Sequence, residues 1–174
     1  MNLPPFDGHA TDIETLEVLF ALVRLQKPEV VVEAGTYRGH GAIFMGSACK
    51  QNKGGMVHTA DPFDNGQMAT LNNAGLSWWV RYWPEDYLSM LETISGPIDL
   101  AFIDASAPDA TGARLRWEHF EATLPRMRPG GMVCVHDTAA DDWSDGEGGI
   151  SVNRIRERCQ INLTTGRGLS IYHV

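Results

Sequence analysis

Acidic and histidine side chains directly follow two short apolar runs in this 174-residue sequence. Asp104 follows the run Ile98–Ile103 in "FIDAS", and His136 with Asp137 follows the run Met132–Val135 in "CVHDT". If both runs are neighbouring parallel strands, their carboxyl ends meet at one edge of a sheet, so these side chains should converge.

This set of side chains permits two chemistries. His136 could act as a general base toward a hydroxyl or amine, because its ordinary pKa of about 6.5 suits neutral pH. Alternatively, Asp104, His136 and Asp137 could bind Mg²⁺ or another divalent cation. A third interpretation is structural, since buried polar groups need partners whatever their function, and Asp104 and His136 could simply bond each other.

A glycine-rich turn follows an earlier apolar run. In "VVEAGTYRGHGAIF", the glycines are Gly35, Gly39 and Gly41, and glycines let a backbone approach a ligand closely. Their spacing is neither the G-x-G-x-x-G of dinucleotide sites nor the G-K-[ST] of a phosphate loop. Glu33 would repel a pyrophosphate and attract a cationic or hydroxyl-rich ligand. Alone, the turn could equally be a structural connection between a strand and a helix.

Further acidic residues follow two other predicted strands. Asp61, in "VHTADPF", ends one strand, where a carboxylate can accept both hydroxyls of a ribose; alternatively, it begins a helix before Pro62. In "YWPEDYL", Glu85 or Asp86 could accept from an exocyclic amine while Tyr82 or Trp83 offers a ring face. The same segment is also a good helix N-terminus without any ligand.

The pattern of apolar residues predicts the strands and helices that would position these side chains. Short apolar runs alternate with amphipathic segments, which predicts an α/β fold with a doubly wound, mostly parallel, Rossmann-like sheet and helices on both faces. The two C-terminal candidates, Gln160–Thr165 and Leu169–His173, lie too close in sequence for a crossover, so this edge should contain one antiparallel strand. The other predicted strands are Val30–Val32, Met56–Ala60, Leu76–Tyr82, Ile98–Ile103 and Met132–Val135, with helices at Gly41–Lys50, Asn65–Ala74, Glu85–Ile94 and Ala113–Leu124.

The chain length favours a single domain over residues 1–174. Residues 1–28 form an expected N-terminal helical segment, whose helix over Thr11–Leu25 would be capped by Thr11 and Glu14. The acidic, glycine-rich stretch at 137–149 is expected to be a loop over the site that could close as a lid, with Trp143 toward substrate. The basic residues around the preceding helix are interpreted as a solvated face; they are Arg114, Arg116, Arg126 and Arg128.

Composition narrows the functional class. The chain is 43% hydrophobic and 21% charged, which is ordinary for a soluble globular protein, and the apolar stretches are far shorter than the roughly 20 residues of a membrane span. A formal net charge of -8 gives no broad basic surface for nucleic acid. Without a secretory pattern we expect a cytoplasmic location. The unpaired spacing of Cys49, Cys134 and Cys159 predicts reduced and buried thiols. We also expect a small-molecule substrate and consider a homodimer.

Together, the motifs resemble those of class I S-adenosyl-methionine (SAM)-dependent methyltransferases, particularly small O-methyltransferases. "VVEAGTYRGHGA" is similar to the first E-x-G-x-x-x-G motif, and Asp61 to the second-strand acid; "IDLAFIDASAP" and "LPRMRPGGMVCVHDT" are similar to the fourth-strand and fifth-strand motifs. The resemblance covers residues 30–174 and implies a sheet of about seven strands with an antiparallel C-terminal edge strand.

The resemblance also implies a cofactor and its contacts. SAM would lie with its ribose at Asp61 and Pro62, and with its methyl group near Asp104. Its adenine would lie at Trp83, Glu85 and Asp86. Its methionine end would lie at the turn, with Glu33 near its ammonium group; the residues of this part are Glu33, Gly35, Tyr37 and Gly39.

The implied activity is transfer of a methyl group to a small-molecule acceptor, with a hydroxyl oxygen favoured. Similar metal-dependent O-methyltransferases hold a cation at the same strand ends, but His136 stands where an acid is common, which favours a base. An alternative is a non-catalytic SAM-binding or structural partner subunit. A nicotinamide-dependent oxidoreductase is disfavoured, because the dinucleotide spacing is absent.

Overall fold

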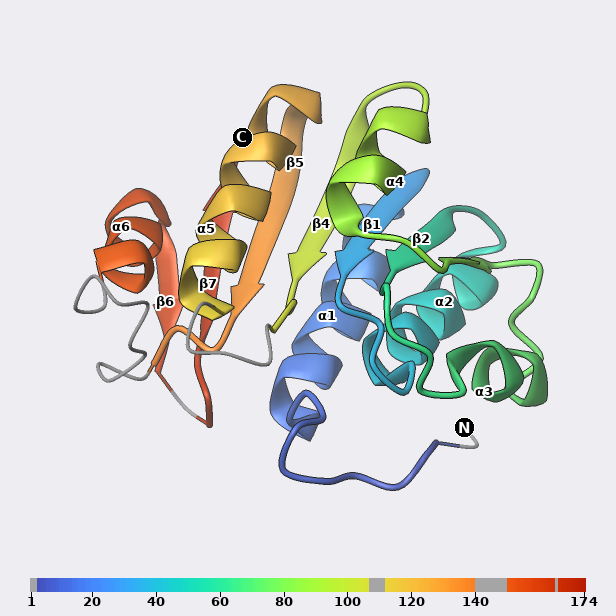
Figure 1. Cartoon of the computed structure of the whole chain (residues 1–174). Helices are drawn as coiled ribbons and strands as arrows, with labels where there is room; N and C mark the ends of the chain where they lie inside the picture. Colours follow the sequence, from blue (N-terminus) through green and yellow to red (C-terminus); the bar gives the residue numbers. More distant parts are fainter. Residues whose placement is uncertain (1–2, 107–111, 140–149, 165) are drawn as a thin grey trace.

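The computed structural model describes residues 3–106, 112–139, 150–164 and 166–174. In this part of the chain, seven strands form one sheet in the order β3-β2-β1-β4-β5-β7-β6 (Figure 1). The strands are β1 (Val30–Ala34), β2 (Met56–Ala60), β3 (Val80–Trp83), β4 (Ile98–Ile103), β5 (Met127–His136), β6 (Ile161–Leu163) and β7 (Leu169–His173).

The sheet is mostly parallel, as the sequence predicts. Strands β1 to β5 pair in parallel, whereas β7 is antiparallel to both β5 and β6. The antiparallel strand therefore lies one place in from the edge, and β6 is outermost. The order in the sheet reverses between β1 and β4, and at such a point the carboxyl ends of the strands border a ligand-binding crevice.

Helices cover both faces of the sheet (Figure 1). Successive residues of a strand point to opposite faces. Phe102 therefore packs in one core cluster with α1, α2 and α3, and Ile103 packs in the other with α4, α5 and α6. The elements are α1 (Ile13–Gln26), α2 (His40–Asn52), α3 (Gln67–Asn73), α4 (Tyr87–Thr93), α5 (Gly112–Thr123) and α6 (Ile150–Arg158), with a short 3₁₀ helix at Leu124–Arg126.

Most element boundaries differ from the predictions by one to a few residues, and the fifth strand begins at Met127 instead of Met132. The third strand begins at Val80 instead of Leu76, because Leu76 belongs to a turn in which its carbonyl accepts from the backbone N–H of Val80 at 2.9 Å. Helix α1 begins at Ile13 with Asp12, not Thr11, as its N-cap. The capping prediction was therefore wrong by one residue.

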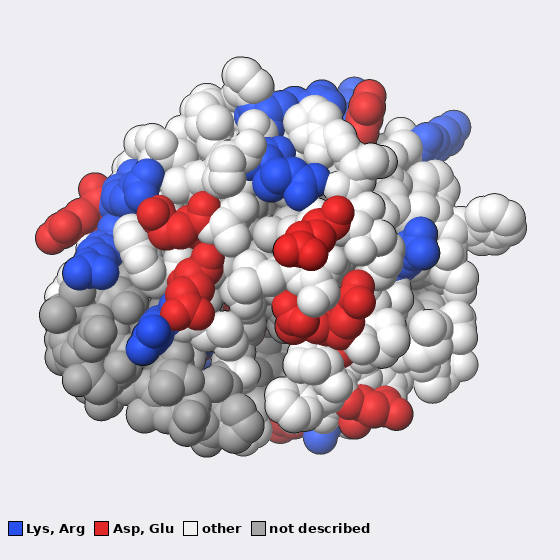
Figure 2. All heavy atoms as spheres, turned by 45° about the horizontal axis from the view of Figure 1, so that its top comes forward, with Lys and Arg blue, Asp and Glu red and all other residues white. Residues whose placement is uncertain are grey.

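Several other features of the chain bear on the sequence-based expectations. All three cysteines are free and buried, as predicted. In the described ranges, no helix combines the length and the apolar character that crossing a membrane requires. Acidic and basic side chains are interspersed over the face in Figure 2. The predicted acidic loop lies mostly outside the described residues, because the description stops at 139 and resumes at 150, and Trp143 lies outside it too.

Candidate active site

A cavity of about 970 Å³ lies where the carboxyl ends of β1, β2 and β4 meet the start of α4 and the N-terminal segment. This volume is at the upper end of the roughly 300–1,000 Å³ that is usual for small-molecule sites. Six of the predicted cofactor residues line it: Gly35, Tyr37, Asp61, Pro62, Asp86 and Asp104. Four other predicted residues, all of them in the described part of the chain, do not: Glu33, Gly39, Trp83 and Glu85.

The glycine turn binds three strand ends together. The backbone N–H of Gly35 donates to Ala60 at 3.0 Å, and that of Asp104 donates to Ala34 at 2.9 Å. Gly35 has φ +91°, and a Cβ there would lie 2.7 Å from the carbonyl oxygen of Asp104. Only glycine fits this position, so the residue serves the fold and also brings bare backbone to the cavity.

Asp61 fixes the conformation of the turn from the end of β2. Its Oδ2 accepts from the backbone N–H of Tyr37 at 2.8 Å, and its Oδ1 accepts from that of Phe63 at 2.9 Å. Tyr37 needs such support because its φ of 46° is left-handed. Burial raises the pKa of Asp61. Each carboxylate oxygen retains further lone-pair capacity, so Asp61 can also accept from hydroxyls in the cavity.

Glu33 lies beneath the turn instead of facing the cavity. The hydroxyl of Thr59 donates to its Oε2 at 2.5 Å, and the side chain is buried. Burial raises the pKa of Glu33 to about 8. The carboxyl group is therefore mostly protonated at neutral pH, and it offers little negative charge to an ammonium group.

Trp83 does not line the cavity, whereas Tyr87 and His119, which the sequence did not indicate, do line it. The indole of Trp83 contacts its strand neighbours: Nε1 donates to His58 Nδ1 at 3.2 Å, and the Arg81 guanidinium lies 4.1 Å from the ring centroid. The cavity wall here contains Tyr87 and His119 instead, beside Asp86. Asp86 is also the N-cap of α4, with Oδ1 accepting from the N–H of Ser89, as the ligand-free interpretation predicts.

His119 is a neutral imidazole in this wall. It is buried, its ring centroid lies 4.8 Å from that of Tyr87, and burial lowers its pKa to about 4. Its position in the helix resembles that of a core residue, so nothing in the local sequence distinguishes it from a packing histidine.

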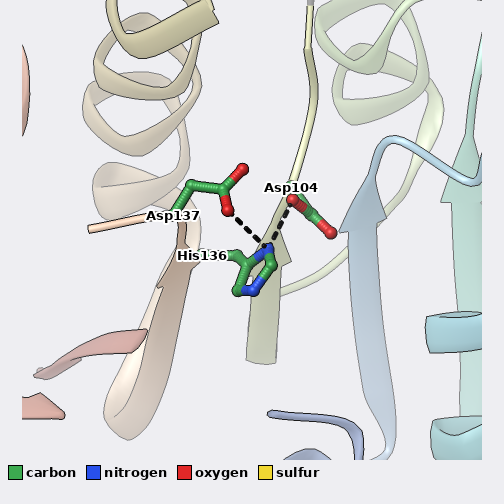
Figure 3. Close-up of side chains that lie close together, drawn as sticks. All are labelled: Asp104, His136 and Asp137. Carbon is green, nitrogen blue, oxygen red and sulfur yellow. Dashed lines mark hydrogen bonds and ion pairs between the residues drawn. The ribbon is translucent and has the colours of Figure 1, made fainter. Parts of the chain in front are cut away.

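The predicted cluster of Asp104, His136 and Asp137 is present (Figure 3). Nδ1 of His136 lies 2.9 Å from Oδ1 of Asp104 and 3.4 Å from Oδ1 of Asp137. Its Nε2 lies 2.7 Å from Oδ2 of Asp12, at the start of α1. Burial alone would lower the pKa of His136, but the charge and hydrogen bond of Asp104, assisted by Asp12 and Asp137, raise it to about 10. His136 is thus an imidazolium with a carboxylate at each ring nitrogen.

Arg116 completes this cluster, and its interpretation as a solvated residue was wrong. Its side chain is buried on α5, and Nη2 lies 2.7 Å from Oδ2 of Asp137 and 3.6 Å from Oδ1 of Asp104. Arg167 binds the other side of Asp137, with Nη2 2.8 Å from Oδ2 and Nε 2.6 Å from Oδ1. A buried carboxylate needs such partners, because an unpaired buried charge is costly.

Of the other three arginines of the predicted solvated face, two bond to other parts of the fold and one is exposed. Arg126 donates to the carbonyl of Ile94 at 2.6 Å, and Arg128 lies 2.7 Å from Asp99, so both hold the chain together. Arg114 is the exposed member, and it forms a helical i,i+4 pair with Glu118 at 3.0 Å.

A divalent cation does not fit the cluster as it is arranged. Asp104, His136 and Asp137 each offer a ligand atom, and these atoms lie within 4.8 Å of one another. However, the guanidinium groups of Arg116 and Arg167 already face both oxygens of Asp137. A histidine ligand must also be unprotonated, whereas both ring nitrogens of His136 face carboxylates.

Asp104 is the member of this cluster that faces the cavity. It lines the cavity together with Thr11 and Arg167, whereas Asp12, His136 and Asp137 do not line it. The Thr11 hydroxyl donates to Oδ2 of Asp104 at 2.6 Å. Burial would raise the pKa of Asp104, but the charges of His136 and Arg116 lower it to about 2. The site therefore presents a fixed, ionised carboxylate with a protonated imidazole behind it.

Solved structures share this architecture. An O-methyltransferase from Bacillus cereus in complex with SAH is 22% identical, with a TM-score of 0.77 over 99% of this chain and 84% of that chain. TomG from Streptomyces achromogenes, an O-methyltransferase involved in tomaymycin synthesis and solved with SAM, is 24% identical, with a TM-score of 0.71 over 93% and 80%. The SAH-bound Podospora anserina methyltransferase PaMTH1 is 16% identical, with a TM-score of 0.73 over 94% and 79%. At these identities the likeness establishes the fold.

The sequence itself establishes the family. The curated proteins give no match to the chain. A family model described as a methyltransferase domain matches residues 32–138, which run from β1 to just beyond the His136–Asp137 pair and make up more than half of the chain. The protein therefore belongs to the methyltransferase-domain family.

Proposed function

We propose that the protein binds SAM in this cavity and transfers its methyl group to a hydroxyl oxygen of a small-molecule acceptor. The observation that carries the proposal is the convergence of the Gly35 turn, Asp61 and Asp104 on one cavity at the crevice of the sheet. Two of the similar methyltransferases, TomG and PaMTH1, were solved with SAM and SAH respectively.

The lining residues suggest how the cofactor would lie. Its methionine end would contact the backbone of the turn at Gly35 and Tyr37, and its ribose hydroxyls would donate to Asp61. Its adenine would lie among Asp86, Tyr87 and His119, which form the far wall of the cavity. Its methyl group would then be directed toward Asp104, which lines the cavity beside Thr11 of the N-terminal segment.

Methyl transfer depends chiefly on alignment and on the exclusion of water. SAM would supply a methyl group activated by its sulfonium, and neutral SAH would leave with the electron pair of the broken sulfur–carbon bond. Asp104 would accept a hydrogen bond from the acceptor hydroxyl and hold its oxygen toward the methyl group. The hydroxyl becomes strongly acidic as the new bond to carbon forms, so even a carboxylate of low pKa can take its proton.

His136 has a supporting role in this proposal. Both of its nitrogens face carboxylates, so neither is available to accept a proton from the acceptor. The role of base, which the sequence analysis considered for His136 beside a metal site, is therefore proposed for Asp104 instead. His136 and Arg116 would keep that carboxylate ionised and oriented, and no step is assigned to a metal ion.

A methyl-transfer assay tests the proposal. SAM with a radiolabelled methyl group would be offered with simple phenols, catechols, hydroxy acids and a protein-free metabolite extract. We expect label in an acceptor, and a rate that falls about 100-fold or more in Asp104→Asn. The variant Glu92→Gln, at an exposed position of α4, should retain the wild-type rate. Binding of SAM without transfer to any acceptor would instead favour the non-catalytic partner subunit.

A further inference from the structure

The carboxylate of Asp12 performs two tasks at once. Its Oδ1 accepts from the backbone N–H of Thr15 at 3.0 Å and thereby caps α1. Its Oδ2 lies 2.7 Å from Nε2 of His136, a residue 124 positions away. The backbone cap needs only one oxygen acceptor, and Asn or Ser would provide it equally well. The Thr15 hydroxyl also donates to Oδ2, at 3.2 Å, and a negative charge is favourable at a helix N-terminus. Neither of these accounts for the short contact with His136.

Thr11, the residue before Asp12, contacts the same pair of side chains from the other side, through Asp104. Thr11 donates to Oδ2 of Asp104 at 2.6 Å, and Oδ1 of Asp104 lies 2.9 Å from Nδ1 of His136. Two consecutive residues thus bracket the Asp104–His136 pair. Every hydrogen-bonding atom of the pair's imidazole and carboxylate has a partner, so neither ring nor carboxylate can rotate without losing a charged contact.

We propose that Asp12 is a positioning residue of the reaction centre, which holds His136 in the orientation and charge state that fix Asp104 at the cavity wall. The part of this inference that concerns Asp104 as the acceptor's partner rests on the proposed function. The link from Asp12 to His136 does not, because it is a property of the folded chain alone.

Charged groups from several elements face His136, and Asp12 has a distinct place among them. Asp104 from β4 and Asp137 after β5 lie on the Nδ1 side, and Arg116 from α5 binds both of these carboxylates. Arg167 also binds Asp137. On the Nε2 side, Asp12 is the carboxylate within contact among the described residues. Removing its charge should therefore change the Nε2 end of the ring while the Nδ1 end keeps its partners.

Nuclear magnetic resonance of ¹⁵N-histidine-labelled protein tests the inference without any acceptor. The His136 signals would be assigned with a His136→Gln variant. In the wild-type protein, we expect both ring nitrogens to stay protonated through neutral pH. In Asp12→Ser, which keeps the cap but is too short to reach the ring, His136 should titrate at least about one pH unit lower. In Asp12→Asn, the amide oxygen can keep the cap while the NH2 group faces Nε2, which disfavours its protonation, so the titration should also fall below the wild-type value.

The control is Glu14→Gln, an exposed position in the first turn of α1 with the same change of charge. It should leave the His136 titration at its wild-type position. If His136 titrates at the same pH in Asp12→Ser and in Glu14→Gln, the positioning role is overturned. Thermal unfolding of all variants separates this result from loss of fold, because Asn and Ser preserve the cap.

Kinetics supply the second readout once an acceptor is in hand. We expect Asp12→Ser to lower kcat about 10- to 100-fold with an unchanged KM for SAM, because misplacement at the reacting atoms affects the chemical step. An unchanged kcat would overturn the inference. If the wild-type protein transfers no methyl group at all, the proposed function fails, while the resonance experiment still decides the role of Asp12.

Discussion

Oε1 of Glu33 lies 2.0 Å from the point where a Cβ of Gly41 would stand, so a larger residue at this second position of α2 would have to displace the buried carboxyl group. This contact explains why the carboxyl group is sealed beneath the helix. The third glycine of the turn therefore accommodates a buried acid, and it also lines the cavity. The same burial raises the pKa of Glu33 to about 8.

The buried acid makes stability depend on pH. Glu33 has a folded-state pKa of about 8 against an ordinary value of 4.5, so between these values the folded state binds more protons than the unfolded state. The free energy of unfolding should therefore fall as pH rises through this window, by up to about 1.4 kcal/mol per unit of raised pKa. Glu33→Gln has no proton to lose and should show a flatter profile in urea unfolding at pH 5, 7 and 9. Equal slopes for the two proteins would contradict this assignment.

The buried guanidinium of Arg116 should contribute strongly to stability. Arg116→Met leaves the buried carboxylate of Asp137 with fewer cationic partners, and we expect it to lower the free energy of unfolding by about 3 kcal/mol. Arg114→Met, at an exposed position on the same helix, removes a surface pair that is typically worth about 0.3–0.5 kcal/mol. Denaturant unfolding of the two variants provides the comparison. A similar loss in both would mean that Arg116 is not the partner that stabilises the cluster.

Metal removal should leave the protein unaffected. Since Arg116 and Arg167 already face the oxygens of Asp137, a divalent cation would have to displace two guanidinium groups and a proton of His136. We expect the same SAM affinity and methyl-transfer rate after dialysis against a chelator and after addition of Mg²⁺. Activity that disappears with the chelator and returns with Mg²⁺ would show that the cluster rearranges around a cation.

The sequence predicts the fold well because the signals are local. Continuous apolar runs mark the covered parallel strands, and the close spacing of the last two strands marks the antiparallel pairing. The predicted third strand begins too early because the apolar residues Leu76, Trp78 and Trp79 precede it, although they form a turn in which Leu76 is buried and Trp78 is exposed. Apolar residues alone do not distinguish a strand from a turn.

The site was predictable only in part, because its missing members are defined by tertiary contacts. Asp104, His136 and Asp137 follow strands that lie side by side, so topology alone brings them together. Asp12 and Arg116 come from helices on opposite faces of the sheet, and each resembles an ordinary cap or surface residue in the sequence. Their roles depend on distances across the fold that no local pattern encodes.

The most direct test of the central claim is a calorimetric titration with SAM and with SAH. The proposed function predicts micromolar binding of both to the wild-type protein, and the same affinity in Glu92→Gln. It also predicts a loss of at least about tenfold in Asp61→Ala, since hydrogen bonds to the ribose and to the N–H of Tyr37 disappear together. No binding of either compound to the wild-type protein, or equal affinity in Asp61→Ala, would contradict the assignment of this cavity as the SAM site.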